Sequence, residues 1–184
     1  MKKLACLFPG LGYTCDKPLL YYSWKLLKTA GWDIIPVRYS GLPSGVKGNP
    51  EKMRQAAFMA LEQAERQLRD VDWIGYEDVL LIGKSIGTAV CAAYAKRHSL
   101  KCRQILFTPV EDTFQFAGPD TIAFHGTADP WADTKAIVAV CEKLDIPLYL
   151  TENANHSLET GDVDADIMEI RKVMQIISRF ITAG

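Results

Sequence analysis

Six short apolar runs punctuate the chain, and longer amphipathic stretches separate them. The runs are rich in aliphatic residues and carry too few polar residues to keep one face in water. They lie at residues 3–8, 33–37, 78–82, 105–108, 122–125 and 147–150. Buried strands that alternate with helices indicate a parallel sheet covered on both sides. The sequence therefore predicts an α/β fold of three layers, with about six mostly parallel strands.

The stretches between the runs have the periodicity of helices. The last one is the clearest, because Ile167, Ile170, Met174, Ile177 and Ile181 recur at spacings of three and four. Asp16 suits the cap of the first helix, and Asn49 followed by Pro50 opens a long second one. The other two helices are expected at residues 88–96 and 131–144. No internal repeat interrupts this order, so residues 1–184 are expected to form a single domain.

The composition excludes several classes of partner. A net charge of −1 argues against a nucleic-acid-binding surface, and no apolar run approaches the length needed to span a bilayer. The first apolar run ends at Pro9, too early for a secretory signal. The five cysteines form no C-x-x-C pair and lie mostly in apolar elements, as free thiols in a reducing compartment do. We therefore expect a cytoplasmic protein whose partner is a small molecule; the sequence says nothing of its oligomeric state.

Residues 83–87 read Gly-Lys-Ser-Ile-Gly and lie between an apolar run and a helix-like stretch. In that context G-x-S-x-G indicates a nucleophile elbow, a strained turn that exposes the serine hydroxyl. The flanking Gly83 and Gly87 are expected where strand and helix leave no room for a β-carbon. Ser85 is thus the candidate nucleophile.

A serine hydroxyl needs a base to activate it, and three histidines are available. His98 lies at the far end of the helix after the elbow. His125 closes an apolar run, where a structural hydrogen bond is the simpler role. His156 lies in a loop at the carboxyl end of the last run, where sites of parallel sheets gather. We therefore predict that His156 is the base.

The acid that orients the base is predicted to be Asp129, which follows the fifth run in a Gly-Thr-Ala-Asp-Pro turn. Asp133 and Glu152 are the alternatives, although Asp133 is expected inside the next helix. The last requirement is a pair of backbone amides for the oxyanion. Ile86 supplies one, and the loop after the first run supplies the other, through Leu11 or, next, Gly12.

These motifs together resemble the α/β-hydrolase superfamily. The resemblance rests on residues 8–12 (Phe-Pro-Gly-Leu-Gly), 83–87, 125–130 (His-Gly-Thr-Ala-Asp-Pro) and 155–156 (Asn-His), and on the order Ser85, Asp129, His156. It implies a small serine hydrolase that cleaves a carboxylic ester or thioester without a cofactor or metal. Two strands that precede the oxyanion loop in the family are missing here. Only residues 109–119 stand where a lid commonly inserts, so a reduced fold without a lid domain is expected.

Aromatic and apolar side chains in the loops near this site are candidates to line a shallow substrate pocket. They are Tyr13, Tyr39, Phe114, Trp131 and Leu158. Ordinary packing at a loop base is an equal alternative for each.

Three other functions are weaker interpretations. A dinucleotide site would need a glycine at Cys15, and a cysteine hydrolase would need a cysteine at Ser85. A metal site from His125, Asp129 and Asp133 has little support in this spacing. The serious alternative is a binding or interaction module that uses the same fold without catalysis.

Overall fold

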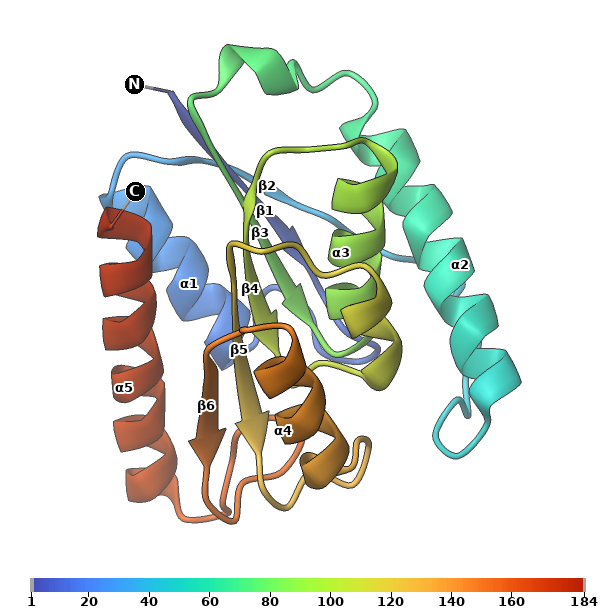
Figure 1. Cartoon of the computed structure of the whole chain (residues 1–184), viewed down its shortest axis with the longest axis vertical. Helices are drawn as coiled ribbons and strands as arrows, with labels where there is room; N and C mark the ends of the chain where they lie inside the picture. Colours follow the sequence, from blue (N-terminus) through green and yellow to red (C-terminus); the bar gives the residue numbers. More distant parts are fainter. Residues whose placement is uncertain (1, 184) are drawn as a thin grey trace.

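The computed structural model describes residues 2–183 and contains one six-stranded sheet. Its order is β2-β1-β3-β4-β5-β6, and every neighbouring pair is parallel. The strands are β1 (Lys3–Phe8), β2 (Asp33–Pro36), β3 (Asp78–Lys84), β4 (Arg103–Phe107), β5 (Thr121–Gly126) and β6 (Leu148–Thr151). All six arrows point the same way in Figure 1, so their carboxyl ends meet at one edge of the sheet. The predicted parallel α/β architecture is confirmed.

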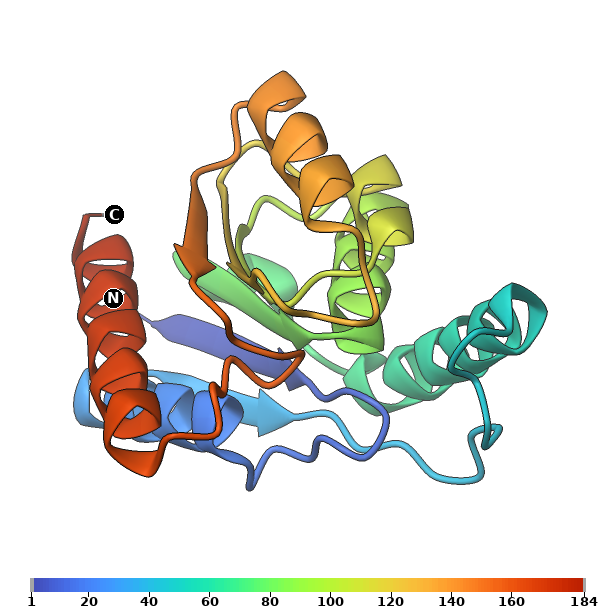
Figure 2. The same cartoon turned by 90° about the horizontal axis from the view of Figure 1, so that it is seen from below.

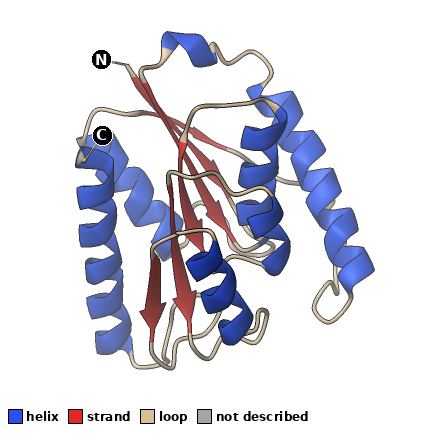
Figure 3. Ribbon diagram, viewed as in Figure 1, coloured by secondary structure: helices blue, strands red, loops and turns tan. Residues whose placement is uncertain are grey.

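Five helices cover the two faces of the sheet (Figures 1 and 3). They are α1 (Pro18–Thr29), α2 (Pro50–Leu68), α3 (Ile86–Arg97), α4 (Thr134–Lys143) and α5 (Val163–Thr182). Helices α1 and α5 lie on one face, and α2, α3 and α4 lie on the other, with α2 outermost in Figure 2. Among residues 2–183, no helix combines the length and the apolar character that crossing a membrane requires.

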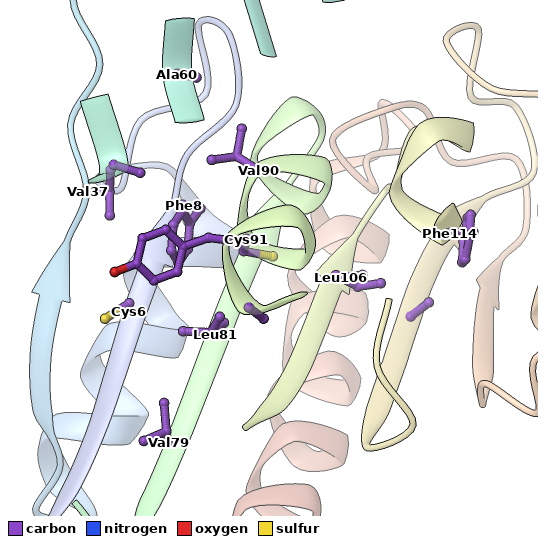
Figure 4. Close-up of a cluster of buried hydrophobic side chains, with 14 of the residues drawn as sticks. Cys6, Phe8, Val37, Ala60, Val79, Leu81, Val90, Cys91, Leu106 and Phe114 are labelled. Carbon is purple, nitrogen blue, oxygen red and sulfur yellow. The ribbon is translucent and has the colours of Figure 1, made fainter. Parts of the chain in front are cut away.

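The alternation of side chains along the strands gives a large hydrophobic cluster on each face of the sheet, and a third, small cluster contains Val46, Ala56 and Ile86. The cluster on the α2–α4 side includes Leu81 of β3, Leu106 of β4 and Val90 of α3 (Figure 4). The cluster on the α1–α5 side includes Leu80 of β3 and Ile177 of α5. The four inner strands β1, β3, β4 and β5 bury both of their faces, which explains why their sequences are mostly apolar. The edge strands β2 and β6 are partly exposed.

Helix α4 begins at Thr134, three residues later than the sequence predicts. Asp133 is the residue before the helix, and its Oδ1 accepts a hydrogen bond from Lys135 N at 3.1 Å. Asp129 Oδ1 accepts one from Trp131 N at 2.9 Å, which holds the preceding residues in a turn. Asp133 therefore caps the amino end of α4, and the turn held by Asp129 keeps residues 130–132 outside the helix. The prediction that Asp133 lies inside the helix is wrong.

The segment between β4 and β5 is short. It contains one 3₁₀ turn, η2 (Glu111–Gln115), which packs against α3 and α4. A segment of this length has no space for an inserted domain. The fold is therefore a reduced one without a lid, as predicted.

Candidate active site

Ser85 joins β3 to α3 in a backbone conformation that non-glycine residues rarely adopt. Its φ is 55° and its ψ is −124°. Such conformations cost about 1–3 kcal/mol and persist only where the surroundings fix them. Here Ser85 N donates to Phe107 O at 2.9 Å, and Thr88 N donates to Ser85 O at 2.9 Å. The neighbouring strand β4 and the first turn of α3 together hold the serine in the elbow conformation.

The two glycines of the motif permit the close approach of strand and helix. A β-carbon at Gly83 would lie 2.5 Å from Thr88 Cα, and one at Gly87 would lie 2.1 Å from Phe8 O. Both distances are far shorter than real contacts, and main-chain atoms cannot move aside cheaply. The predicted lack of room at these two positions is confirmed.

Ser85, His156 and Asp129 form a continuous hydrogen-bonded row at the carboxyl edge of the sheet. Ser85 Oγ lies 2.7 Å from His156 Nε2, and His156 Nδ1 lies 2.7 Å from Asp129 Oδ2. The three residues come from three different strand ends, those of β3, β6 and β5. The structure therefore brings together the three residues that the sequence singled out.

Neighbouring groups hold the imidazole in place. Thr108 Oγ1 donates to His156 O at 3.0 Å, which fixes the loop that carries the histidine. The indole of Trp131 stacks on the His156 ring, with 5.2 Å between centroids and 21° between planes. The side chain of Asp129 is fully buried, whereas that of His156 is 15% exposed. A molecule that approaches from solvent can therefore reach His156 but not Asp129.

Burial is the main cause of the lowered pKa of His156, and the positive charge of Lys84 lowers it further. The hydrogen bond to Asp129 opposes both effects without overcoming them. Burial acts to raise the pKa of Asp129, but the hydrogen bond from His156 and the one from Trp131 N outweigh it, so the pKa is lowered. The histidine is thus neutral and the aspartate ionised near neutral pH.

The other candidates have structural partners. His98 Nε2 lies 2.7 Å from Glu65 Oε2 at the far end of α3. His125 Nε2 lies 3.1 Å from Thr134 Oγ1, while its Nδ1 is 3.8 Å from Asp129 Oδ2. Of the three histidines, His156 alone contacts Ser85. Within residues 2–183, no group of three or more His, Cys, Asp or Glu side chains is arranged to hold a metal ion.

The loop after β1 forms a tight turn against the serine. Gly10 N donates to Tyr13 O at 3.0 Å, and Tyr13 N donates to Gly10 O at 3.3 Å, with Leu11 and Gly12 in the two central positions. A β-carbon at Gly10 would lie 3.1 Å from Ser85 Cβ, so this turn touches the elbow. Ile86 is the first residue of α3, where amides have no partner within the helix. The oxyanion roles of Leu11, Gly12 and Ile86 stay predictions.

Solved structures resemble this chain, whereas no protein-family model and no curated protein matches its sequence. A proposed hydrolase of the alpha/beta superfamily from Xanthomonas campestris pv. campestris matches over 100% of both chains, with a TM-score of 0.70 and 14% identity. A serine hydrolase without a lid from Xanthomonas campestris has a TM-score of 0.60 and 16% identity, over 96% of this chain and 81% of that one. An esterase from Pyrococcus furiosus has a TM-score of 0.71 and 11% identity, over 99% of this chain and 83% of that one. The chain has the α/β-hydrolase fold.

In this α/β-hydrolase fold, a cavity of about 650 Å³ lies beside the turn at residues 9–12. Its walls include Tyr21 and Trp24 of α1 and residues 36–42 after β2. Two glutamines of α2 clamp that segment: the Gln67 side chain bonds both backbone groups of Arg38, and the Gln63 side chain bonds both of Ser40, at 2.7–3.0 Å. The cavity wall is thus built in advance of any ligand.

The five residues predicted to line a pocket have different places. Tyr39 lines the cavity, and Trp131 covers the ring of His156. Tyr13 is 8% exposed, and its hydroxyl accepts a hydrogen bond from Leu19 N. Phe114 and Leu158 are buried in the two large hydrophobic clusters, so packing rather than pocket lining describes them.

Two parts of the site escaped the sequence reasoning. The cavity walls from α1 were missed because the residues of an amphipathic helix do not reveal which of them border a hollow. Lys84 was treated as a variable position of the motif, yet its side chain is only 1% exposed. A lysine at the end of an uninterrupted apolar strand was the signal for that burial.

Proposed function

We propose that this chain is a serine hydrolase that cleaves a carboxylic ester or thioester through an acyl-enzyme. The observation that carries the proposal is the hydrogen-bonded row of Ser85, His156 and Asp129, with distances of 2.7 Å at both links. A neutral imidazole between a hydroxyl and a buried carboxylate is the arrangement that activates a serine.

The first half of the reaction forms the acyl-enzyme. With Nδ1–H of His156 donating to Asp129, Nε2 accepts the proton of Ser85 as Oγ attacks the substrate carbonyl carbon. The amides of Leu11 and Ile86, with Gly12 as the alternative to Leu11, donate to the oxyanion that forms. The bond to the alcohol or thiol then breaks, and the imidazolium returns its proton to that leaving group.

The second half releases the acid. Nε2 of His156 takes a proton from a water molecule, whose oxygen attacks the acyl carbon. The tetrahedral intermediate collapses, Ser85 Oγ leaves with the proton, and the free carboxylic acid departs.

We place the larger part of the substrate in the cavity beside the oxyanion turn. The cavity has a volume of about 650 Å³, within the usual range of sites for small molecules. The short segment between β4 and β5 leaves the site uncovered, which favours small or accessible acyl groups over long lipid chains.

A fluorophosphonate probe tests the proposal, because it reacts with activated serines. The purified wild-type chain should be labelled, and Ser85→Ala should not. Ser99→Ala is the matched control, since Ser99 is exposed at the far end of α3 and its loss should leave labelling unchanged. If the folded wild type is not labelled, the chain is a non-catalytic module of the same fold.

Hydrolysis of p-nitrophenyl esters of increasing chain length then defines the substrate. We expect short and aromatic acyl groups to be preferred. A clear preference for long acyl chains would overturn the part of the proposal that concerns substrate size.

A further inference from the structure

Lys84 precedes the candidate nucleophile and has no role in the steps above. It is the last residue of β3, and it points to the same face as Leu80 and Ile82, toward α1 and α5. Its side chain is 1% exposed, and its Nζ lies 4.8 Å from the centroid of the Tyr13 ring. Within residues 2–183, no carboxylate lies close enough to form an ion pair with it. The Tyr13 ring is thus the group that this cation contacts.

A lysine in this position does not serve stability. Burial lowers the pKa of Lys84 to about 7, and the negative charges of Asp129 and Glu159 offset only part of that effect. A charge taken out of water without a paired carboxylate destabilises a fold, and a methionine of similar length would pack without that cost. A costly residue beside a reactive one points to function.

Tyr13 links Lys84 to the oxyanion turn. The backbone of Tyr13 closes the turn through its two hydrogen bonds with Gly10. Its hydroxyl accepts a hydrogen bond from Leu19 N at 3.0 Å, which fixes the far end of the ring to α1. The Lys84 ammonium lies over the face of the same ring. Movement of that ring would therefore move the turn that touches Ser85.

We propose that Lys84 is a positioning residue of the active site: its buried ammonium holds the Tyr13 ring and, through it, the oxyanion turn in place over Ser85. The proposal rests on the proposed hydrolase function. It assigns the variable residue of the G-x-S-x-G motif a task in this chain, that of joining the elbow to the amides that stabilise the oxyanion.

The charge of Lys84 has a second effect in the same range of pH. The ionisable groups that act with it are Tyr13 after β1, Asp129 after β5, and His156 and Glu159 after β6. Its positive charge lowers the pKa of His156, which keeps the base neutral in mildly acidic solution. Because the pKa of Lys84 is about 7, both effects are present below that pH and fade above it.

The test is Lys84→Met, measured as kcat and KM for p-nitrophenyl acetate between pH 5.5 and 9. We expect kcat at pH 6 to fall about tenfold, the size of a desolvated cation–π contact, with KM unchanged within about twofold. The ratio of wild-type to variant kcat should shrink toward unity at pH 9. The acid limb of the variant's profile should also move to higher pH, because His156 loses a positive neighbour.

Lys96→Met is the matched control, because Lys96 lies over the ring of Phe116, at 5.5 Å, on the far side of α3. It should leave kcat and the pH profile unchanged. Tyr13→Leu removes the ring that the ammonium contacts, so it should lower kcat at pH 6 by a similar factor. Adding Lys84→Met to Tyr13→Leu should then lower kcat little further.

The outcomes separate the two proposals. If the wild type hydrolyses no ester and is not labelled by the fluorophosphonate probe, the proposed hydrolase function is wrong. An active wild type with a Lys84→Met variant that keeps the wild-type kcat and pH profile overturns the role of Lys84. If Lys84→Met does not fold, Tyr13→Leu decides alone, and wild-type kcat at pH 6 in that variant overturns the inference.

Discussion

The two edges of the sheet hold polar clusters that are built in opposite ways. At the amino edge, the Arg103 guanidinium binds the Asp78 carboxylate and the carbonyl oxygens of Phe180 and Ile181, and the ring of Trp32 lies beside it. The guanidinium of Arg103 thus has a carboxylate, two backbone carbonyls and an aromatic ring as partners. That cluster ties β3, β4 and the end of α5 together.

At the carboxyl edge, some of the polar groups are strained or short of partners. Ser85 has a positive φ, and the Lys84 ammonium lies over the Tyr13 ring with no carboxylate paired to it within residues 2–183. Among residues 2–183, His125 Nδ1 is also one of the buried polar atoms without a hydrogen bond. Satisfied clusters add to stability, whereas unsatisfied ones persist where a reaction needs them. Mutations at the two edges should therefore separate stability from activity.

The largest expected effect is that of Ser85→Ala. Loss of the nucleophile should lower kcat for p-nitrophenyl acetate by about 10⁴-fold or more. The free energy of unfolding should stay within about 0.5 kcal/mol of the wild-type value, because alanine fits the same backbone. Stopped assays and calorimetry measure the two quantities. A marked loss of stability would mean that the carboxyl edge also holds the fold together.

Asp129→Asn should have the next largest effect on activity. The amide cannot stabilise the imidazolium and favours the wrong tautomer, so kcat should fall about 10³–10⁴-fold. His125→Asn is the comparison, since His125 lies 3.8 Å from Asp129 and does not reach the serine. A similar loss in both variants would place His125 in the catalytic machinery.

Arg103→Met at the amino edge should show the opposite pattern. It leaves the carboxylate of Asp78 partly buried without its cation, which should cost about 2–4 kcal/mol of unfolding free energy. The kcat of the folded fraction should equal that of the wild type. Urea unfolding, with activity measured well below the midpoint, gives both values. A kcat lowered tenfold would mean that the amino edge also affects activity.

A smaller effect is expected in the pH dependence of kcat of the wild type, which tests the lowered pKa of His156. Burial lowers the pKa of His156 below its ordinary value of 6.5. The base is neutral above that lowered pKa and protonated below it, so activity should persist under pH 6.5 and then fall. The profile of kcat for p-nitrophenyl acetate measures the midpoint. A midpoint above 7, or an acid optimum, contradicts the proposed role of His156.

The smallest effect is expected from substitutions of residues that line the cavity, and it should be seen in KM. Tyr21 lines it, whereas the adjacent Tyr22 does not, although both side chains are partly exposed. Tyr21→Ala should raise KM for an aromatic ester about threefold by removing apolar contact area. Tyr22→Ala should leave KM unchanged. An equal change of KM in both variants would mean that the substrate does not bind in the cavity.

The fold and the order of Ser85, Asp129 and His156 were open to prediction because they depend on local patterns. Apolar runs give strands, and parallel strands place their following loops at one edge. The glycines beside Ser85 then gave the turn its form. None of these steps requires knowledge of how distant side chains pack.

The points that the sequence left open or predicted wrongly depend on such packing. Phe114 and Leu158 follow strands, as pocket residues do, but the directions of their side chains are decided by contacts with distant elements. Likewise, α4 begins only at Thr134 because Asp129 holds residues 130–132 in a turn and Asp133 caps the helix. The contact between Lys84 and Tyr13 could not be predicted for the same reason, since only the fold brings the Tyr13 ring next to the Lys84 ammonium.

Gly83 and Gly87 have a consequence for how this protein can evolve or be redesigned. A single added methyl group at either position meets main-chain atoms at 2.5 Å or less. The elbow therefore tolerates almost no variation, whereas Gln63 and Gln67 hold the segment at residues 36–42 through its backbone, which leaves the side chains of that segment free to vary. New substrate preferences are accessible through that segment and α1, at positions where a substitution leaves the elbow untouched.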